Sequence, residues 1–201
     1  MKKILYLHGF SSAGSTGTAT NLRNHLFADY GITVVSPDIP VSPAEAVPFI
    51  EQVVRDEQPD LIIGTSMGAM YTELQHGHLR ICVNPSFHMA RLLTFKHLGK
   101  NVEFQNPRRD GARQFKVDKQ MVAEFKEIEQ KLSLNAKMIT PADRDLIWGI
   151  FGKDDPTVNC RADFSRAYGT AHMRVIEGEH SLTDAMLKRD VLPLIKQLLS
   201  L

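Results

Sequence analysis

Leu61-Ile62-Ile63-Gly64-Thr65-Ser66-Met67-Gly68-Ala69-Met70 is the stretch that decides the fold. Its apolar beginning, from residue 60 to residue 63, predicts a buried strand, and the residues after Gly68 predict a helix. The connection between them has the G-x-S-x-G pattern of a nucleophile elbow, in which the flanking glycines leave room for the strand and the helix to approach each other. The pattern predicts that Ser66 presents its Oγ at a helix start, where N–H groups and the helix dipole favour negative charge. An ordinary strand-to-helix turn can have the same sequence pattern, so the assignment of a catalytic serine depends on the residues of other loops.

The composition indicates one domain with a single core. At 201 residues, the chain is long enough to bury such a core, and no linker-like segment divides it. The 24 Lys and Arg residues balance 23 Asp and Glu residues, which gives no electrostatic reason to expect nucleic acid or an anionic membrane as a partner. Cys82 lies in an apolar run and Cys160 is the other cysteine, so we expect neither a disulfide framework nor a metal site built on cysteines. The apolar run after Met1-Lys2-Lys3 ends at His8, too early for a signal peptide or a membrane span, and we expect a cytoplasmic protein.

Strands and helices alternate along most of the chain. This order predicts parallel strands joined by crossover helices, which gives a mostly parallel sheet of about six strands with helices on both faces. Strands are expected at residues 3–7, 32–36, 60–63, 79–83, 145–151 and 171–176, and helices at residues 20–30, 43–57, 69–77, 161–168 and 184–201, the last one bent near Pro193.

The alternation lapses between residues 86 and 140. Helices are expected at residues 88–98 and 119–132, with an irregular stretch between them that runs through Phe115. An insertion at this point can cover the strand ends where the elbow lies, so we interpret it as a small lid. It is rich in basic residues, which fit either a solvated surface or contact with an anionic part of a substrate: Lys96, Lys100, Arg108, Arg109, Arg113, Lys116 and Lys119, against Glu103, Asp110 and Asp118.

A serine nucleophile needs a general base, and the base needs a carboxylate that orients it. In proteins with this elbow, the acid and then the histidine follow the serine in the chain, each on a loop after a later strand. The loop after residue 151 carries two adjacent acids, Asp154 and Asp155, and His180 follows the last strand. We favour Asp155, midway between Gly152 and Val158, while Asp154 stays open as the alternative.

Two main-chain N–H groups are expected to hold a developing oxyanion. One belongs to Met67, the residue after the serine, and the other to Phe10 in the loop after the first strand. Gly9 and Phe10 are expected to contact the substrate, and His8 to anchor the loop. We interpret the remaining histidines as ordinary surface or structural residues: His25, His76, His78, His88, His97 and His172.

Two other classes of function deserve comparison. The stretch from Gly9 to Thr16 fits a phosphate-binding loop, except that Ser15 occupies the position of the lysine that contacts the terminal phosphates. Nucleotide binding is therefore disfavoured. The other class is an inactive scaffold that binds a small ligand or a partner, although such a scaffold has little reason to retain a serine, an acid and a histidine in this order.

Several motifs together resemble the YqiA/YcfP-like small bacterial esterases of the α/β-hydrolase superfamily. The similarity covers nearly the whole chain: Leu7-His8-Gly9-Phe10-Ser11-Ser12, the Ile63–Gly68 elbow, Val83-Asn84-Pro85, the loop from Gly152 to Asp155, and Gly178-Glu179-His180. The resemblance implies a minimal three-layer α/β-hydrolase fold and hydrolysis of an acyl ester or thioester without a metal or organic cofactor. It also implies Ser66 as nucleophile, Asp155 as acid, His180 as base, and Phe10 and Met67 as oxyanion donors.

Overall fold

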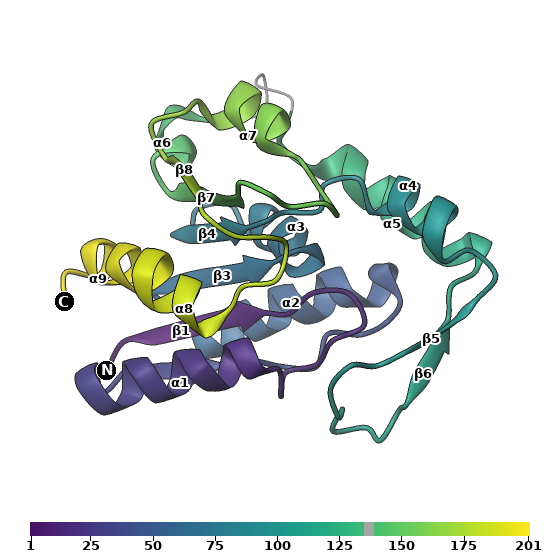
Figure 1. Cartoon of the computed structure of the whole chain (residues 1–201), viewed down its shortest axis with the longest axis horizontal. Coiled ribbons are helices and arrows are strands. Elements are labelled where there is room, and N and C mark those ends of the chain that lie inside the picture. Colours follow the sequence, from purple (N-terminus) through teal and green to yellow (C-terminus); the bar gives the residue numbers. More distant parts are fainter. Residues whose placement is uncertain (135–138) are drawn as a thin grey trace.

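The computed structural model describes residues 1–134 and 139–201. Within these residues, six parallel strands form one sheet in the order β2-β1-β3-β4-β7-β8 (Figure 1). The predicted α/β fold with a sheet of about six strands is confirmed, and the strands lie close to their predicted positions: β1 (Lys3–Leu7), β2 (Thr33–Val35), β3 (Leu61–Thr65), β4 (Arg80–Val83), β7 (Ile147–Gly152) and β8 (Met173–Ile176).

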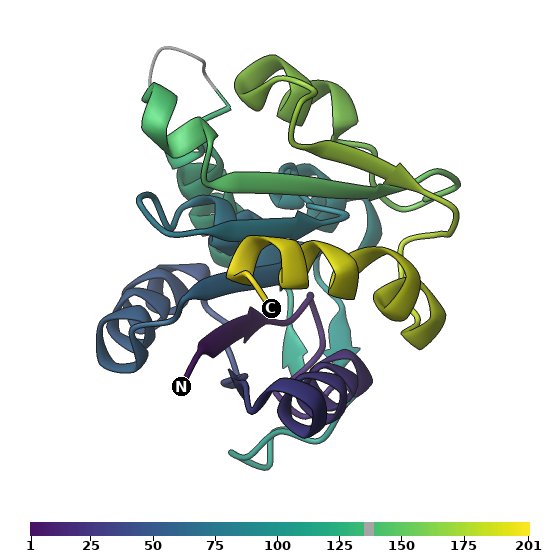
Figure 2. The same cartoon turned by 90° about the vertical axis from the view of Figure 1, so that its left-hand side faces the viewer.

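Both faces of the sheet are buried, because successive side chains of a strand point to opposite faces. On β1, Ile4 and Tyr6 pack under the helix α1 (Gly17–Tyr30) and the carboxyl-terminal helices. Leu5 and Leu7 belong to the apolar cluster on the other face. There they lie with helices that include α2 (Pro43–Glu57) and α7 (Arg161–Tyr168), so that the sheet is the middle layer of three (Figures 1 and 2).

Parallel strands place all their carboxyl ends at one edge of the sheet. The loops after β1, β3, β4, β7 and β8 therefore meet there, although they are far apart in the sequence. Such an edge is where open α/β sheets commonly bind ligands. The elbow after β3 lies among these loops, and it leads into the short helix α3 (Met67–Glu73), which ends earlier than the predicted helix at residues 69–77.

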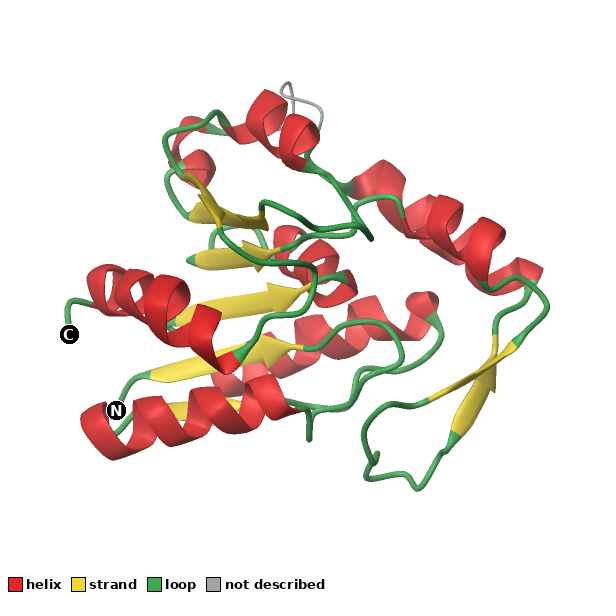
Figure 3. Ribbon diagram, viewed as in Figure 1, coloured by secondary structure: helices red, strands yellow, loops and turns green. Residues whose placement is uncertain are grey.

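The segment between β4 and β7 contains two features that the sequence did not predict, a pair of strands and the short helix α6 (Pro141–Arg144). Instead of an irregular stretch, it holds an antiparallel pair of strands, β5 (Asn101–Glu103) and β6 (Gln114–Lys116), which stands apart from the main sheet (Figure 3). Each strand has three residues and one apolar side chain, too few for a visible alternation. The flanking helices are α4 (Met89–Lys96), α5 (Lys119–Lys131) and α6 (Pro141–Arg144). Residues 135–138 of the predicted lid lie outside the described residues.

The carboxyl-terminal helix is interrupted near Pro193, as predicted. A short helix α8 (Asp184–Met186) continues into a π-helical turn η2 (Leu187–Val191) and then into α9 (Leu192–Leu199). Pro193 lies in the first turn of α9, directly after the π-helical turn, and it cannot donate the N–H hydrogen bond that an uninterrupted α-helix would have there. No helix in the described part of the chain has the length and apolar character needed to cross a membrane.

Candidate active site

The elbow has the geometry that its glycines suggest. Ser66 adopts φ +55° and ψ −119° between β3 and α3, a conformation that is rare for a residue with a side chain. A Cβ on Gly68 would lie 2.0 Å from the carbonyl oxygen of Leu7, and one on Gly64 would lie 2.3 Å from the carbonyl oxygen of Gly68. Both glycines are therefore required by the close packing of β1, β3 and α3.

Three side chains from three different loops form one chain of hydrogen bonds. The Nε2 atom of His180 lies 2.9 Å from the Oγ of Ser66, and its Nδ1 atom lies 2.7 Å from the Oδ2 of Asp155. Because a carboxylate only accepts hydrogen bonds, Nδ1 carries the proton, and Nε2 accepts the hydrogen bond that the Ser66 hydroxyl donates. The arrangement leaves the ring nitrogen beside Ser66 able to take up a proton.

Asp155 is the acid that reaches His180, and Asp154 is not. The Oδ1 atom of Asp155 accepts hydrogen bonds from the N–H groups of Thr157 at 2.7 Å and Val158 at 3.0 Å, which leaves Oδ2 for the histidine. The Asp155 side chain is only 4% exposed, whereas Asp154 lies on the surface. The tight turn after Asp155 thus fixes both the position of the carboxylate and the oxygen that it offers.

The loop after β1 lies against the serine. A Cβ on Gly9 would lie 3.3 Å from the Cβ of Ser66 and 3.9 Å from its Oγ, so this loop passes directly beside the hydroxyl. Among the described residues, the N–H groups of Phe10 and Met67 have no hydrogen-bond acceptor. Neither N–H group is therefore used by the described part of the chain itself.

His8 anchors this loop, as predicted. Its Nε2 atom accepts a hydrogen bond from the N–H of Ile39 at 3.0 Å, so Nδ1 carries the proton and donates to the carbonyl oxygen of Gly9 at 2.9 Å. Burial lowers the pKa of His8 to about 4, and the positive charge of Arg108 acts in the same direction. The ring is neutral at pH 7, and it ties the loop beside Ser66 to the segment after β2.

A cleft of about 580 Å³ opens over Ser66 and His180. Gly9 and Phe10 line it, and so do four residues of the insertion between β4 and β7: Leu92, Lys96, His97 and Gln105. Lys96 is the one member of the basic group noted in the sequence that reaches this cleft within the described residues. Arg108 instead contacts Asp110, the carbonyl oxygen of Ile39 and the ring of Phe104.

A family model described as "Uncharacterised protein family (UPF0227)" matches residues 3–198. The chain belongs to this family. The match spans the elbow and both loops that carry Asp155 and His180. It confirms the resemblance to the YqiA/YcfP-like proteins that the sequence motifs suggested.

Solved structures with the same fold as this UPF0227 protein carry the names of hydrolases. Est1E from Butyrivibrio proteoclasticus with bound ferulic acid is 14% identical, with a TM-score of 0.66 over 100% of this chain and 90% of that chain. Alpha/beta hydrolase domain-containing protein 10 from mouse is 12% identical, with a TM-score of 0.60 over 98% and 90%. A thioesterase domain from the curacin biosynthetic pathway is 14% identical, with a TM-score of 0.55 over 98% and 91%. These matches show that the fold is that of the α/β-hydrolases.

Histidine–aspartate pairs recur in this UPF0227 chain, so a pair alone does not mark the site. His25 pairs with Asp184 at 2.7 Å, and His76 with Asp143 at 3.0 Å. These pairs do not reach the serine of the elbow. The distinguishing feature of His180 is that its second nitrogen contacts Ser66, which depends on the loop after β8 lying beside the loop after β3.

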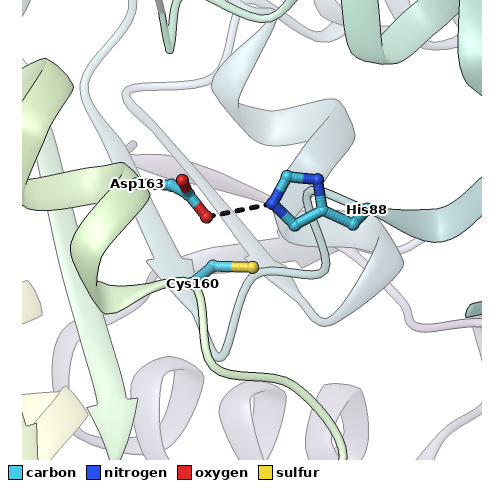
Figure 4. Close-up of side chains that lie close together, drawn as sticks. All are labelled: His88, Cys160 and Asp163. Carbon is cyan, nitrogen blue, oxygen red and sulfur yellow. Dashed lines mark hydrogen bonds and ion pairs between the residues drawn. The ribbon is translucent and has the colours of Figure 1, made fainter. Parts of the chain in front are cut away.

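One further cluster joins the insertion to α7. His88, Cys160 and Asp163 lie with their potential ligand atoms within 4.8 Å of one another (Figure 4). A tetrahedral zinc site keeps its ligand atoms roughly 3.3 to 3.8 Å apart, and no fourth protein ligand joins these three among the described residues. The Nε2 of His88 instead contacts the carboxylate of Asp163 at 3.0 Å, and burial raises the pKa of Cys160 to about 11. The expectation that the protein uses no metal stays a prediction.

Sequence reasoning missed two polar residues of the UPF0227 site. Asn84 and Ser86 follow β4 and are buried, and Val83-Asn84-Pro85 had served only as one of the motifs of the family resemblance, with no role for its side chains. The Oγ of Ser86 lies 3.1 Å from the Oγ of Ser66, and the side-chain amide of Asn84 contacts the loops after β7 and β8. Their position after a central parallel strand was the available signal, since such residues gather at the same edge of the sheet as Ser66.

Proposed function

We propose that this protein is a serine hydrolase that cleaves carboxylic esters or thioesters of acyl substrates through an acyl-enzyme intermediate. The observation that carries the proposal is the hydrogen-bonded chain from Asp155 through His180 to Ser66. Neighbours of the same fold described as a lipolytic enzyme of the lipase and esterase families and as a thioesterase domain support this class of reaction. Nothing in the proposed chemistry calls for a metal or an organic cofactor.

The reaction follows from the positions of the protons. His180 takes the proton of Ser66 as the Oγ attacks the acyl carbon, and the carbonyl oxygen becomes an oxyanion that the N–H groups of Phe10 and Met67 bind. Asp155 stabilises the imidazolium. His180 then gives its proton to the departing alcohol or thiol, and water repeats the attack on the acyl-enzyme with His180 again as base. The carboxylic acid leaves and Ser66 regains its proton.

We also infer that the insertion between β4 and β7 acts as a lid and shapes the pocket. Four of its residues line the cleft, and Phe10 on the opposite loop packs its ring against two aromatic residues of the insertion, His97 at 5.6 Å and Phe115 at 5.3 Å between ring centroids. Substrate contacts by Gly9 and Phe10 belong to the same proposal. The ring of Phe10 would then lie between the acyl group and the insertion.

A fluorophosphonate probe tests the proposal, because it reacts covalently with an activated serine. We expect labelling at Ser66, located by mass spectrometry, and none in Ser66→Ala. Ser36→Ala is the control, since Ser36 is a buried serine that directly follows the outer strand β2 of the same sheet. This variant should be labelled like the wild type. A correctly folded wild-type protein that stays unlabelled would contradict the proposal and favour the alternative, an inactive scaffold that binds a ligand or a partner.

If Ser66 is labelled, a series of ester and thioester substrates of increasing acyl length identifies the substrate class. We expect Ser66→Ala to retain its fold and to lose activity by roughly a millionfold, the scale at which serine nucleophiles contribute in other hydrolases. A folded Ser66→Ala variant with undiminished turnover would rule out the mechanism.

A further inference from the structure

We propose that the segment Asn84-Pro85-Ser86 is the positioning element of this site. It supplies none of the three residues of the hydrogen-bonded chain, yet it fixes the relative positions of the three loops that carry them. The kinetic part of this inference rests on the proposed function, whereas its structural part does not. The segment follows β4, which lies between β3 and β7 in the sheet, so it sits between the loop of Ser66 and the loop of Asp155.

Asn84 joins two of the loops through its side-chain amide. Its Oδ1 atom accepts a hydrogen bond from the N–H of Gly152 at 2.6 Å, at the start of the loop that carries Asp155. Its Nδ2 atom donates to the carbonyl oxygen of Glu179 at 3.0 Å and to that of His180 at 2.8 Å. Both N–H bonds of the amide are thus used on the histidine loop, and the oxygen is used on the aspartate loop. The amide spans the two loops whose separation sets the distance between His180 and Asp155.

The backbone at Asn84 is adapted to this task. Asn84 is 2% exposed and adopts φ +44°, a left-handed conformation that asparagine tolerates better than most residues with a side chain. Its N–H donates to the carbonyl oxygen of Ile150 at 2.8 Å, which continues the pairing of β4 with β7. A buried amide with three good hydrogen bonds rigidifies the groups that it joins, because leaving any of them unpaired is costly.

Ser86 holds the third loop, the elbow itself. Its N–H donates to the carbonyl oxygen of Ser66 at 3.1 Å, and the two Oγ atoms are also 3.1 Å apart. The Ser66 hydroxyl has one proton, and this proton is directed at His180. The proton between the two hydroxyls therefore belongs to Ser86, which donates to the oxygen of Ser66. Ser86 is 1% exposed, so its hydroxyl is shielded from bulk solvent.

The donated hydrogen bond has a chemical consequence. The oxygen of Ser66 gains negative charge when His180 removes its proton, and again when it leaves the acyl carbon during hydrolysis of the acyl-enzyme. A donor aimed at this oxygen stabilises both transition states more than the resting serine, which is the condition for catalysis. Ser86 also keeps Ser66 in its strained conformation, since it holds the carbonyl and the hydroxyl of the same residue.

Two variants remove the two contacts separately. Asn84→Gly removes the amide without straining the backbone, because glycine accepts a positive φ. Ser86→Ala removes the hydroxyl and keeps the N–H that holds the carbonyl of Ser66. Ser36→Ala is the matched control, since it removes a buried hydroxyl from the end of β2 in the same sheet. Circular dichroism and thermal unfolding of all three show whether they are folded.

The first measurement does not require activity. In the proton NMR spectrum of the wild type and of Ser36→Ala, we expect a far-downfield resonance from the Nδ1–H that His180 donates to Asp155, assigned with His180→Gln. Asn84→Gly should broaden or lose this resonance while it stays folded, because the two loops separate. A purely structural role for Asn84 would lower the melting temperature and leave the resonance in place, which would overturn the inference.

The second measurement is the rate of fluorophosphonate inactivation. We expect Ser86→Ala to lower the maximal inactivation rate constant roughly 10- to 100-fold, which is the effect of one hydrogen bond to a charged oxygen. The probe concentration that gives half of the maximal rate should change little. Asn84→Gly should also lower this rate constant. Wild-type rates in a folded Ser86→Ala would overturn the role of Ser86. A wild type that shows the resonance but never reacts would refute the proposed function and leave the positioning by Asn84 to be judged by the NMR result.

Discussion

Replacing either of two adjacent acids by its amide gives opposite predictions. Asp155→Asn changes the group 2.7 Å from Nδ1 of His180, whereas Asp154→Asn changes a side chain on the surface of the same loop. The amide oxygen of an asparagine at position 155 must take the place of Oδ1, because the N–H groups of Thr157 and Val158 point there. Its NH₂ group then faces Nδ1, which must become the acceptor. Nε2 consequently carries the proton and can no longer remove the one on Ser66.

The size of the effect follows from the distance. A carboxylate 2.7 Å from an imidazolium nitrogen interacts with it by about 6 kcal/mol at an effective dielectric constant of about 20. Loss of this stabilisation in the transition state corresponds to a decrease in kcat of roughly 10⁴-fold. Asp154→Asn should leave kcat within about twofold of the wild type, since a charge on the surface is strongly screened.

Steady-state hydrolysis of a reactive ester measures this difference, with fluorophosphonate labelling as a second assay. Circular dichroism and thermal melting confirm that both variants are folded. Equal losses in the two variants, or a larger loss in Asp154→Asn, would refute the assignment of Asp155 as the orienting acid. A wild-type rate in a folded Asp155→Asn would refute the role of the carboxylate altogether.

Two further predictions concern stability. In Gly68→Ala, the new Cβ would lie 2.0 Å from the carbonyl oxygen of Leu7, so we expect thermal unfolding at a clearly lower temperature, or loss of labelling at Ser66 if the elbow moves. Gly17→Ala is the control, because no atom lies within 4 Å of the new Cβ. Equal melting temperatures of the two variants would contradict the packing argument. The pKa of His8 is about 4 in the folded protein against an ordinary 6.5, so between pH 4 and pH 6.5 the unfolded chain binds more protons than the folded one. The contribution of neutral His8 to stability is therefore complete above pH 6.5 and is lost as the pH falls through this window. At 1.36 kcal/mol per pKa unit, the shift corresponds to about 3 kcal/mol of folding stability. The difference in the free energy of urea unfolding between the wild type and His8→Asn should decrease by about that amount from pH 7 to pH 4. A constant difference would contradict the assignment.

The arrangement of loops around Ser66 was accessible from the sequence. Parallel strands place their following loops at one edge, and the chain order of Ser66, Asp155 and His180 matches the order of loops along that edge. The sequence could not separate Asp154 from Asp155 by contact, because both belong to one loop. The orientation of that loop depends on the N–H groups of residues 157 and 158, and hence on a local turn without a composition signal.

Asn84 and Ser86 were inaccessible for a different reason. Asparagine and serine are common after strands, and their roles here arise from partners 20 to 96 residues away in the sequence. Likewise, the strands β5 and β6 were missed because Val102 and Phe115 provide a single apolar residue each, and the pairing between them crosses a long loop. Local periodicity carries no information about contacts of this kind.

The order of strands in the sheet has an evolutionary meaning. Because β4 and β7 are neighbours, the segment between them separates no pair of adjacent strands in the main sheet, although its helix α5 buries Met121, Phe125 and Ile128 in the apolar cluster on one face of that sheet. Such a segment is a cassette, because its length and sequence can change without altering the order of the strands, provided that the buried face of α5 is kept. The boundary of the cassette lies after Ser86, since the residues up to that point hold the elbow. A chimaera that takes the segment from Phe87 to β7 from a related protein should therefore keep the reaction of this chain and acquire the substrate preference of that protein.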